Sequence, residues 1–220
     1  MPIRANAHFL WAYFSLFHLL FVTSRQLDVL FMIITIARQC GCGALEVGKI
    51  LSQNYDIPLY TRNSLQEAAI SKGMLPKMED FFEERPVDEL MSAITFSFER
   101  DDVQEKFCRT FRELIGEKDC IVIGRCGNFI FRNRADLVSV FLHGDPQDRV
   151  CHIMTSEGLS REEAENFVHS TDEKRISYHK FYTGLTWGNA PDYDIALDVC
   201  RLGAHKTASL IEEYCKAVIE

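Results

Sequence analysis

The chain has 220 residues, a formal net charge of −8 at pH 7 and a hydrophobic content of 47%. Such a chain is long enough for one well-packed domain with an insertion, and its apolar content is that of an ordinary globular protein. The acidic balance excludes the general nucleic-acid binders, which are usually basic. A small anionic ligand stays open, because a local group of arginines can bind an anion in an acidic protein.

The eight cysteines indicate a reduced cytoplasmic protein and not a disulfide framework. No two of them have the C-x-x-C spacing, and Cys40 and Cys42 stand too close together for ordinary zinc-finger spacing. Cys120 and Cys200 fall in apolar segments, where a thiol packs as a small hydrophobe. We therefore expect a cytoplasmic location, no disulfides and no zinc site.

Residues 1–31 differ in character from the rest. Residues 9–22 are nearly all apolar or aromatic, but a membrane-spanning helix needs about 20 such residues. No small-x-small cleavage site follows this segment. Three interpretations stay open: a membrane-surface or signal-anchor segment, an additional packing helix, or an extension outside the working domain. The last is favoured over membrane contact, because Met32 stands directly before the first strand, so the working domain is expected at 32–220.

From residue 33 onward, predicted strands and helices alternate. Strands are expected at 33–36, 57–60, 120–123, 137–142 and 193–199, and helices at 44–55, 63–72, 146–155, 172–182 and 206–219. The segment 78–118 is helical in composition and is broken at Pro86, and Ser160–Glu163 is a capping box. Pro58 favours an edge or a strand-start position. The alternation predicts a parallel sheet with helices on both faces. Glycine turns at 41–43 and 124–127 follow two strands, so both are expected at one ligand-binding crevice.

The turn after the first strand is a degraded phosphate-binding loop. A standard P-loop reads GxxxxGK and then Ser or Thr. The near match at 43–49 is rejected, because residues 44–47 favour a helix and Ile50 has no hydroxyl. In the better register, Ala44 takes the lysine position and Leu45 the hydroxyl position. The candidate phosphate- and ATP-binding residues are Arg38, Gln39, Cys40, Gly41, Cys42, Gly43 and Ala44.

What this turn retains is a glycine backbone, a helix N-terminus and a neighbouring arginine, Arg38. Glu46 is the nearest candidate metal ligand, acting through water. A plain strand-to-helix turn without any ligand is the alternative interpretation.

Three later motifs resemble those of known kinases. GRCGNFIFRNRADLVSVFLHGDPQDRV (124–150) is similar to the GRD-x-G segment of bacterial cytidylate kinases, and TDEKR (171–175) is similar to the D-x-x-R of their lid. The run R-x-x-Y-x-x-x-YTG-x-x-WG…YD (175–194) resembles the cytidylate kinase-like family specifically, as does the strand and turn at 33–43. The resemblance covers about residues 32–215.

This resemblance implies the P-loop nucleoside monophosphate kinase fold: an α/β, three-layer structure with a five-stranded parallel sheet. A helical monophosphate-binding insertion (about 61–118) and a lid (about 156–190) are implied as well. The implied reaction transfers the γ-phosphoryl group of ATP, with Mg²⁺, to a nucleoside monophosphate such as CMP. The implied partners are small nucleotides, and the sequence carries no indication of an oligomeric state.

The resemblance also assigns roles to residues. Arg125 and Arg175 are the implied catalytic residues, and Gly124, Arg125, Asp172 and Arg175 are the implied acceptor-nucleotide residues. The alternatives are a surface arginine at 125 and a helix ion pair between 172 and 175.

Several neighbouring side chains are expected to have a structural role or stay open. Lys174, His179 and Lys180 are expected on a solvated face, and Arg149 either approaches ATP or lies at the surface. Tyr178, Tyr182 and Trp187 are expected to pack together and not to stack on a base. Asp198 is expected to cap a helix.

Three departures weaken the assignment of an activity. Cys126 replaces the Asp of the GRD motif, Leu45 replaces a common Arg, and Thr61 replaces a common Asp. These changes bring CMP specificity into question and favour a second hypothesis, a nucleotide-binding module without catalysis. A membrane-attached regulator that uses residues 9–22 is a third.

Overall fold

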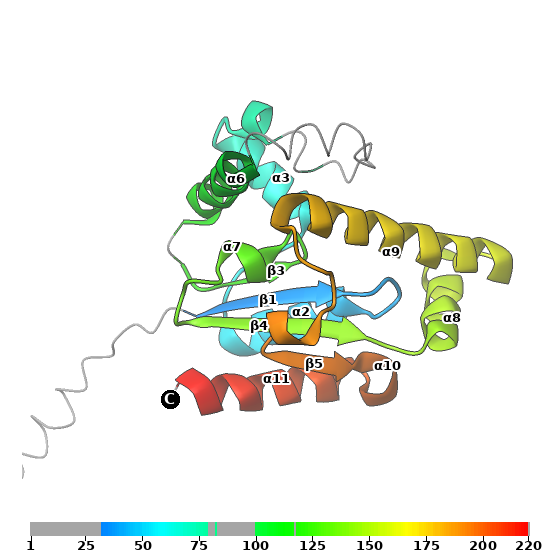
Figure 1. Cartoon of the computed structure of the whole chain (residues 1–220). Helices are drawn as coiled ribbons and strands as arrows, with labels where there is room; N and C mark the ends of the chain where they lie inside the picture. The colour runs from blue at the N-terminus through cyan, green and yellow to red at the C-terminus, as the bar shows by residue number, and fades with distance from the viewer. Residues whose placement is uncertain (1–31, 79–81, 83–99, 117, 220) are drawn as a thin grey trace, which may run out of the picture. The chain divides into compact units, whose positions relative to one another are not determined.

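The structure, a computed structural model, describes residues 32–78, 82, 100–116 and 118–219. The expectations for residues 1–31 and for Pro86 lie outside the described residues. The sheet has five strands, all parallel, in the order β2-β3-β1-β4-β5 (Figure 1). They are β1 (Ile33–Arg38), β2 (Leu59–Tyr60), β3 (Cys120–Ile123), β4 (Leu137–His143) and β5 (Ile195–Asp198). The predicted five-stranded parallel sheet is confirmed.

β1 lies at the centre of the sheet, because it pairs with β3 along one edge and with β4 along the other, and both of its faces are covered. Its residues Ile33–Ile36 pair in register with Cys120–Ile123 of β3, and Ile33 to Arg38 pair with Leu137 to Leu142 of β4. Continuous β-branched sequence is typical of such a doubly covered parallel strand. β2 lies at one edge of the sheet, directly after Pro58, as the proline predicts.

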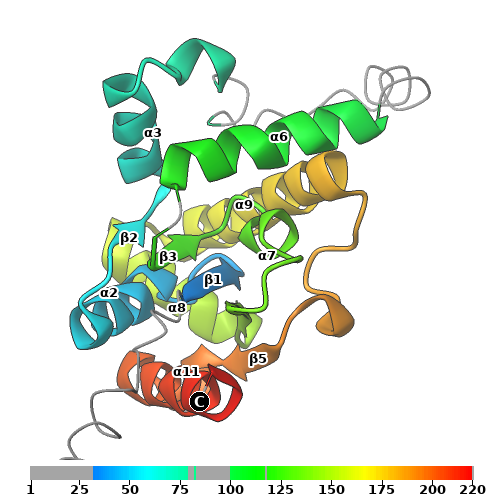
Figure 2. The same ribbon diagram turned by 90° about the vertical axis from the view of Figure 1, so that its left-hand side faces the viewer.

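Helices cover both faces of this sheet (Figure 2). The helices are α2 (Ala44–Tyr55), α3 (Arg62–Ser71), α6 (Arg100–Ile115), α7 (Gly127–Ile130), α8 (Pro146–Glu157), α9 (Arg161–Thr183), α10 (Val199–Leu202) and α11 (Ala204–Ile219). Two short 3₁₀ helices, η1 (Leu75–Lys77) and η2 (Ala190–Asp192), complete the described elements. α2 and α11 pack on one face, whereas α6, α7 and α9 pack on the other.

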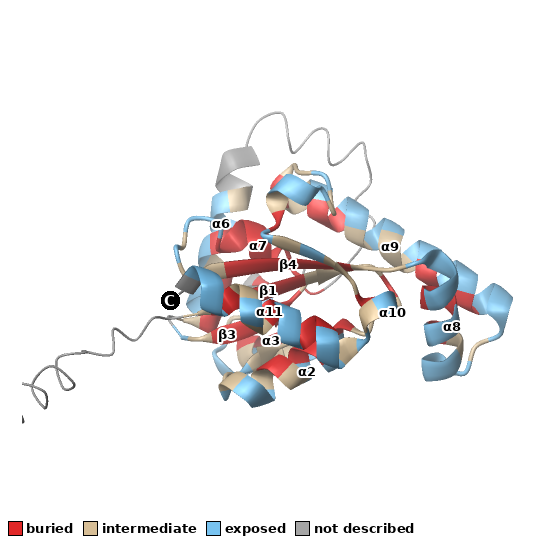
Figure 3. Cartoon of the chain, turned by 90° about the horizontal axis from the view of Figure 1, so that it is seen from below, coloured by how far each residue is buried: buried red, intermediate tan, exposed pale blue. Residues whose placement is uncertain are grey.

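Two apolar cores result, one on each face. On the α2 and α11 side, Ile34 and Ile36 of β1 pack with Val47, Leu51 and Ile211. On the other side, Ile33 and Val122 pack with aromatic residues of α6 and α7. β1, β3 and β4 are accordingly buried along most of their length, whereas the edge strands β2 and β5 are only partly buried. The outer turns of α8 and α9 are exposed (Figure 3).

Capping residues explain where α8 and α9 begin. Asp145 caps α8 by accepting a hydrogen bond from the N–H of Gln147, and Pro146 stands in the first helical turn. The predicted capping box is confirmed, because Ser160 and Glu163 hydrogen bond reciprocally at the start of α9. α9 then runs unbroken for 23 residues to Thr183, so the helix predicted at 172–182 is its second half. In the described residues, no helix combines the length and apolar character needed to cross a membrane.

Candidate active site

The glycine turn after β1 presents unpaired backbone N–H groups. Gly41 (φ 81°) and Gly43 (φ 60°) have left-handed backbone conformations, which glycine adopts without strain. α2 begins at Ala44, as the preferred register predicts. Among the described residues, no acceptor forms a hydrogen bond with the backbone N–H groups of Gly43, Ala44 and Leu45. A left-handed residue followed by a helix N-terminus is an arrangement that binds anions.

The turn is packed tightly against α8. A Cβ atom at Gly41 would lie 2.5 Å from the carbonyl oxygen of Arg149, so no larger residue fits without movement of the backbone. Burial raises the pKa of the Cys40 thiol, and it raises the pKa of the Cys42 thiol to about 12. Both thiols are therefore neutral at pH 7, and they add no negative charge to the turn.

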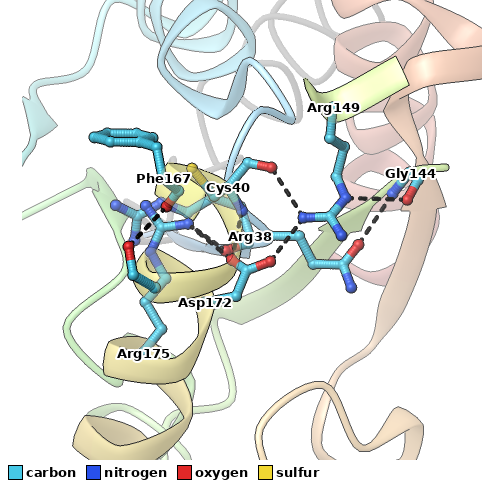
Figure 4. A network of polar contacts seen from close by, with 9 residues as sticks. Arg38, Cys40, Gly144, Arg149, Phe167, Asp172 and Arg175 are labelled. Carbon is cyan, nitrogen blue, oxygen red and sulfur yellow. Dashed lines mark hydrogen bonds and ion pairs between the residues drawn. The ribbon is translucent and has the colours of Figure 1, made fainter. Parts of the chain in front are cut away.

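One carboxylate connects the lid helix α9 with this turn (Figure 4). Asp172 accepts a hydrogen bond from the Cys40 N–H at 2.7 Å and pairs with Arg149 Nη1 of α8 at 2.7 Å. Arg175 Nη1 lies 3.5 Å from Asp172 Oδ1, the oxygen that accepts from Cys40, and donates to the Arg38 carbonyl at 3.2 Å. We call Arg149, Asp172 and Arg175, together with the Cys40 backbone that they surround, the clamp.

The clamp is largely withdrawn from solvent. The Arg149 and Asp172 side chains are 9% and 14% exposed. Arg149 also donates to the carbonyl oxygens of Cys40 (3.1 Å) and Gly144 (3.2 Å). Arg149 was expected either near ATP or at the surface. The surface alternative is wrong, because the Arg149 side chain is held inside by the carboxylate of Asp172 and by two backbone carbonyl oxygens.

Two further contacts fix the turn. The Gln39 side chain accepts a hydrogen bond from the Gly144 N–H at 3.2 Å, so it joins the ends of β1 and β4. The Cys40 side chain packs between α8 and α9, against Ile153 and Val168. The turn is thus joined to α8 and α9 by a small apolar core as well as by hydrogen bonds to Arg149 and Asp172.

A small cavity lies over the end of β1, beneath α9. We call it the lid cavity; its lining residues are Thr35, Ala37, Arg38, Gly124, Arg125, Cys126, Gly127, Asn128, Arg175, Tyr178, His179 and Trp187. Its free volume is about 30 Å³. Among the described residues that line it there are three arginines and no aspartate or glutamate.

The arginines reach the lid cavity from three elements. Arg38 ends β1, Arg125 follows β3 and Arg175 belongs to α9. A Cβ atom at Gly124 would overlap the Arg38 guanidinium, so glycine at this position makes room for that charge. Arg125 is buried, and its guanidinium lies 5.3 Å from the centre of the Tyr178 ring. Asp172 lies outside the lining of this cavity and belongs to the clamp.

Polar atoms in this cavity lack partners. Thr35 Oγ1, Arg175 Nε and His179 Nε2 are buried without a hydrogen bond. Burial lowers the pKa of His179 to about 4, and the positive charge of Lys180 acts in the same direction, opposed by Asp192. His179 is therefore neutral at pH 7. The expectation that His179 lies on a solvated face is wrong, because α9 turns this residue toward the sheet.

A larger cavity of about 340 Å³ lies beside the glycine turn, and we call it the turn cavity. The residues that line it are Gly41, Cys42, Gly43, Glu46, Asp148, Cys151, His152, Val199, Cys200, Gly203 and Ala204. It contains two carboxylates and neither lysine nor arginine among the described residues. Glu46, the predicted metal ligand, thus lies near Asp148, although no described group of three or more His, Cys, Asp or Glu side chains has a metal-binding arrangement.

The two glycine turns do not share one cavity. Gly124 and Gly127 line the lid cavity, whereas Gly41 and Gly43 line the turn cavity. One crevice was expected because both turns follow the carboxyl ends of predicted parallel strands, where ligands bind. The clamp residues pack α8 and α9 onto the first turn, and side-chain packing of this kind leaves no signal in the sequence.

Most of the structural alternatives for the neighbouring residues are confirmed. Tyr182 stacks on Phe107 with ring centres 4.3 Å apart, and Trp187 meets Phe141 edge to face. Asp198 caps α10 by accepting from the N–H of Arg201. Thr61 caps α3.

The match to known families agrees with this geometry. The model of the cytidylate kinase-like family matches residues 33–201. The chain belongs to the cytidylate kinase-like family. Its fold and membership are those of a kinase-like P-loop protein, which is the class that the sequence resemblance indicated.

Solved structures show the same fold. An uncharacterized protein from Eubacterium ventriosum is 25% identical, with a TM-score of 0.64 over 84% of this chain and 99% of its own. A gluconokinase from Sinorhizobium meliloti is 13% identical, with a TM-score of 0.51 over 84% of this chain and 94% of its own. No curated protein matches the chain. Gluconokinase and cytidylate kinase take different acceptors, so the fold leaves the acceptor of this cytidylate kinase-like protein open.

Proposed function

We propose that this protein transfers the γ-phosphoryl group of ATP to a nucleoside monophosphate, CMP or a similar one. The observation that carries the proposal is the lid cavity, where three arginines meet without a carboxylate in the lining. Guanidinium groups bind phosphate oxygens bidentately, and a site of this charge favours a phosphate-bearing acceptor.

The cavity chemistry also favours a phosphate over an alcohol as the acceptor. A kinase that phosphorylates a hydroxyl uses a base, commonly an aspartate, to accept the hydroxyl proton. The lid cavity has no aspartate or glutamate in its described lining, and Thr61 caps a helix where related chains carry Asp. A nucleoside monophosphate needs no such base, because its phosphate is already ionised near pH 7.

ATP fits the glycine turn through the backbone. The unpaired N–H groups of Gly43 and Ala44 and the N-terminus of α2 supply the donors for its phosphates. Ala44 is buried and adds no charge at the lysine position. Glu46 and Asp148 border the same cavity and would hold Mg²⁺ together with the phosphates. Bound Mg²⁺ would neutralise negative charge on the transferred phosphoryl group.

Arg125 and Arg175 are proposed to bind the acceptor phosphate and the transferred phosphoryl group. Arg38 stands between the two cavities, since it ends β1 and its guanidinium reaches the second glycine turn. Asp172 is proposed to hold the lid closed over the turn, which would exclude water from the reacting phosphates.

The test is an acceptor panel with the full-length protein, ATP and Mg²⁺. We expect ADP to form with CMP or another nucleoside monophosphate, and the phosphorylated acceptor to appear in equal amount. Gluconate and shikimate serve as alcohol controls and should give no acceptor-dependent ADP. The absence of acceptor-dependent ADP with every monophosphate would contradict the proposal.

A nucleotide-binding module without turnover is the second candidate. The lining of the turn cavity favours it, because this lining has two carboxylates and, among the described residues, no lysine to bind the phosphates. Calorimetry separates the candidates: this one predicts saturable nucleotide binding without ADP formation.

A further inference from the structure

Three buried polar atoms in the lid cavity have no hydrogen-bond partner among the residues that the structure describes. They are Thr35 Oγ1 from β1, and Arg175 Nε and His179 Nε2 from α9. The Thr35 and His179 residues are only 2% and 3% exposed. Buried polar groups are nearly always hydrogen-bonded, and each unpaired one costs about 1–3 kcal/mol. Three of them on one small cavity indicate a ligand that pairs them.

The chemistry of the three atoms restricts the ligand. Arg175 Nε is always a donor, so the ligand must present an acceptor atom there. The guanidinium groups of Arg38, Arg125 and Arg175 add positive charge, and the described lining contains no carboxylate. The ligand is therefore an anion with several acceptor oxygens.

The size of the cavity agrees with part of a phosphate group. About 30 Å³ is free, and one water-sized atom needs roughly 10–15 Å³ on this scale. Two oxygens of a tetrahedral oxyanion fit this space, and the remainder of the ligand must lie outside it.

His179 is the group that responds to such a ligand. The charged groups that face it are Asp192 from η2, Lys180 and Arg175 from α9, Arg38 from β1, and Arg125 beside the Cys126 thiol. Asp192 is the only negative one among these, and burial outweighs it, so the imidazole is neutral in the absence of a ligand. A bound oxyanion would reverse this balance, because an opposite charge within about 4–6 Å favours the protonated form.

We propose that Thr35, Arg175 and His179 form a buried subsite for two oxygens of a phosphate group, in which His179 takes up one proton from solvent when the oxyanion binds. This inference rests on the proposed function, since it places the acceptor phosphate in the lid cavity. It adds Thr35 and His179 to the acceptor site, and neither was singled out for binding in the sequence.

Nuclear magnetic resonance of the histidine side chains tests the proton uptake directly. The probe is sulfate at about pH 6, because sulfate stays a dianion there and any proton must go to the protein. We expect the His179 nitrogen signals to be those of neutral imidazole without sulfate and of imidazolium at saturation. The signal that disappears in His179→Gln identifies the residue. His169→Gln, an exposed residue of the same helix, is the matched control and should change nothing else.

Two results would overturn the inference. One is a His179 that stays neutral with sulfate bound. The other is a sulfate affinity that is equal in the wild-type protein, His179→Gln and Thr35→Val, which would mean that the cavity holds only water. Thr35→Val is nearly isosteric, so it preserves a test if His179→Gln does not fold.

A comparison of CMP with sulfate shows whether the subsite binds the phosphate ester of a nucleotide or only a free oxyanion. CMP should displace sulfate and protonate His179 as well, if the subsite belongs to the acceptor. We expect KM for the acceptor to rise about 10- to 100-fold in His179→Gln and Thr35→Val, with KM for ATP unchanged, as for the loss of one hydrogen bond to a charged group. Proton uptake without phosphoryl transfer would overturn the proposed function alone. Phosphoryl transfer with a neutral His179 would overturn this inference alone.

Discussion

The lid cavity and the turn cavity are neighbours with opposite chemistry. The first has three arginines and no carboxylate in its described lining, and the second has two carboxylates and neither lysine nor arginine. The first has a free volume of about 30 Å³, whereas the second has about 340 Å³. The arginine side chains are therefore concentrated at the lid cavity.

Under the proposed function, this difference would explain how the protein binds phosphate with a turn that lacks the P-loop lysine. Backbone N–H groups and a helix N-terminus do not depend on side-chain identity, so the turn keeps its donors without lysine. Bidentate recognition of a phosphate requires guanidinium groups at fixed positions, and these are retained around the lid cavity. The clamp residues connect α8, α9 and the turn.

The largest effect is expected when the clamp loses its charge. Asp172→Asn leaves Arg149 buried without its carboxylate, and breaking a buried pair in this way lowers the free energy of unfolding by about 3–5 kcal/mol. Urea denaturation measures the change. Glu165→Gln removes the exposed Arg161–Glu165 pair of the same helix and should cost less than about 0.5 kcal/mol. Equal losses in both variants would mean that the clamp does not join the two regions.

The next effect concerns the neutral imidazole of the lid cavity. The pKa of His179 is lowered from 6.5 to about 4, so the unfolded chain binds the proton more tightly than the folded protein. The stability from this group is present above pH 6.5 and is lost as the pH falls toward 4. Between those values the wild-type protein should lose about 3 kcal/mol more than His179→Gln. Equal losses in the two proteins across this pH window would show that the pKa of His179 is not lowered in the folded protein.

The functional asymmetry is tested by Arg125. Arg125→Ala should lower kcat/KM for the acceptor by about 100-fold, as expected for a charge-assisted contact of roughly 2–3 kcal/mol, with a much smaller effect on KM for ATP. Arg132→Ala, an exposed arginine stacked on Phe129, is the control and should retain activity. A larger effect on KM for ATP than for the acceptor would place the donor in the lid cavity and reverse the comparison.

The smallest effect separates two glycines of one turn. Gly43→Ala meets no atom closer than 3.8 Å and should cost about 1 kcal/mol for its left-handed backbone. Gly41→Ala has the same backbone cost and also collides with the Arg149 carbonyl, so it should cost about twice as much. Thermal unfolding compares the two variants. If they are equally stable, α8 does not press on the turn.

Local sequence predicted the elements well where one local signal dominated. The β-branched run of β1, the start of α2 at Ala44 and the capping box of α9 were all recognisable, since each depends on residues within one turn or strand. The position of β2 at the sheet edge followed from Pro58. The number of strands in the sheet came only through the family resemblance, and the order of the strands came from the structure.

Contacts between distant segments were beyond local reasoning. Asp172 and Cys40 are 132 residues apart, and Arg149 and Cys40 are 109 residues apart. The burial of His179 had one available signal, its spacing from Tyr178 and Tyr182 on a helix with an apolar face. Its polar character favoured the solvated interpretation, which the structure corrected.

The sequence by itself determined that the chain is an α/β protein with a glycine turn at the end of a buried strand, because local propensity and hydrophobic pattern act over a few residues. It also identified Arg125, Asp172 and Arg175 as residues of interest, through motifs that lie close together along the chain. Only the tertiary structure decided that Arg125 and Arg175 line one cavity, that Asp172 accepts a hydrogen bond from the turn, and that the two glycine turns line different cavities. The physical reason is that charge and burial depend on what the fold brings together, and the packing of α8 and α9 against β1 sets both.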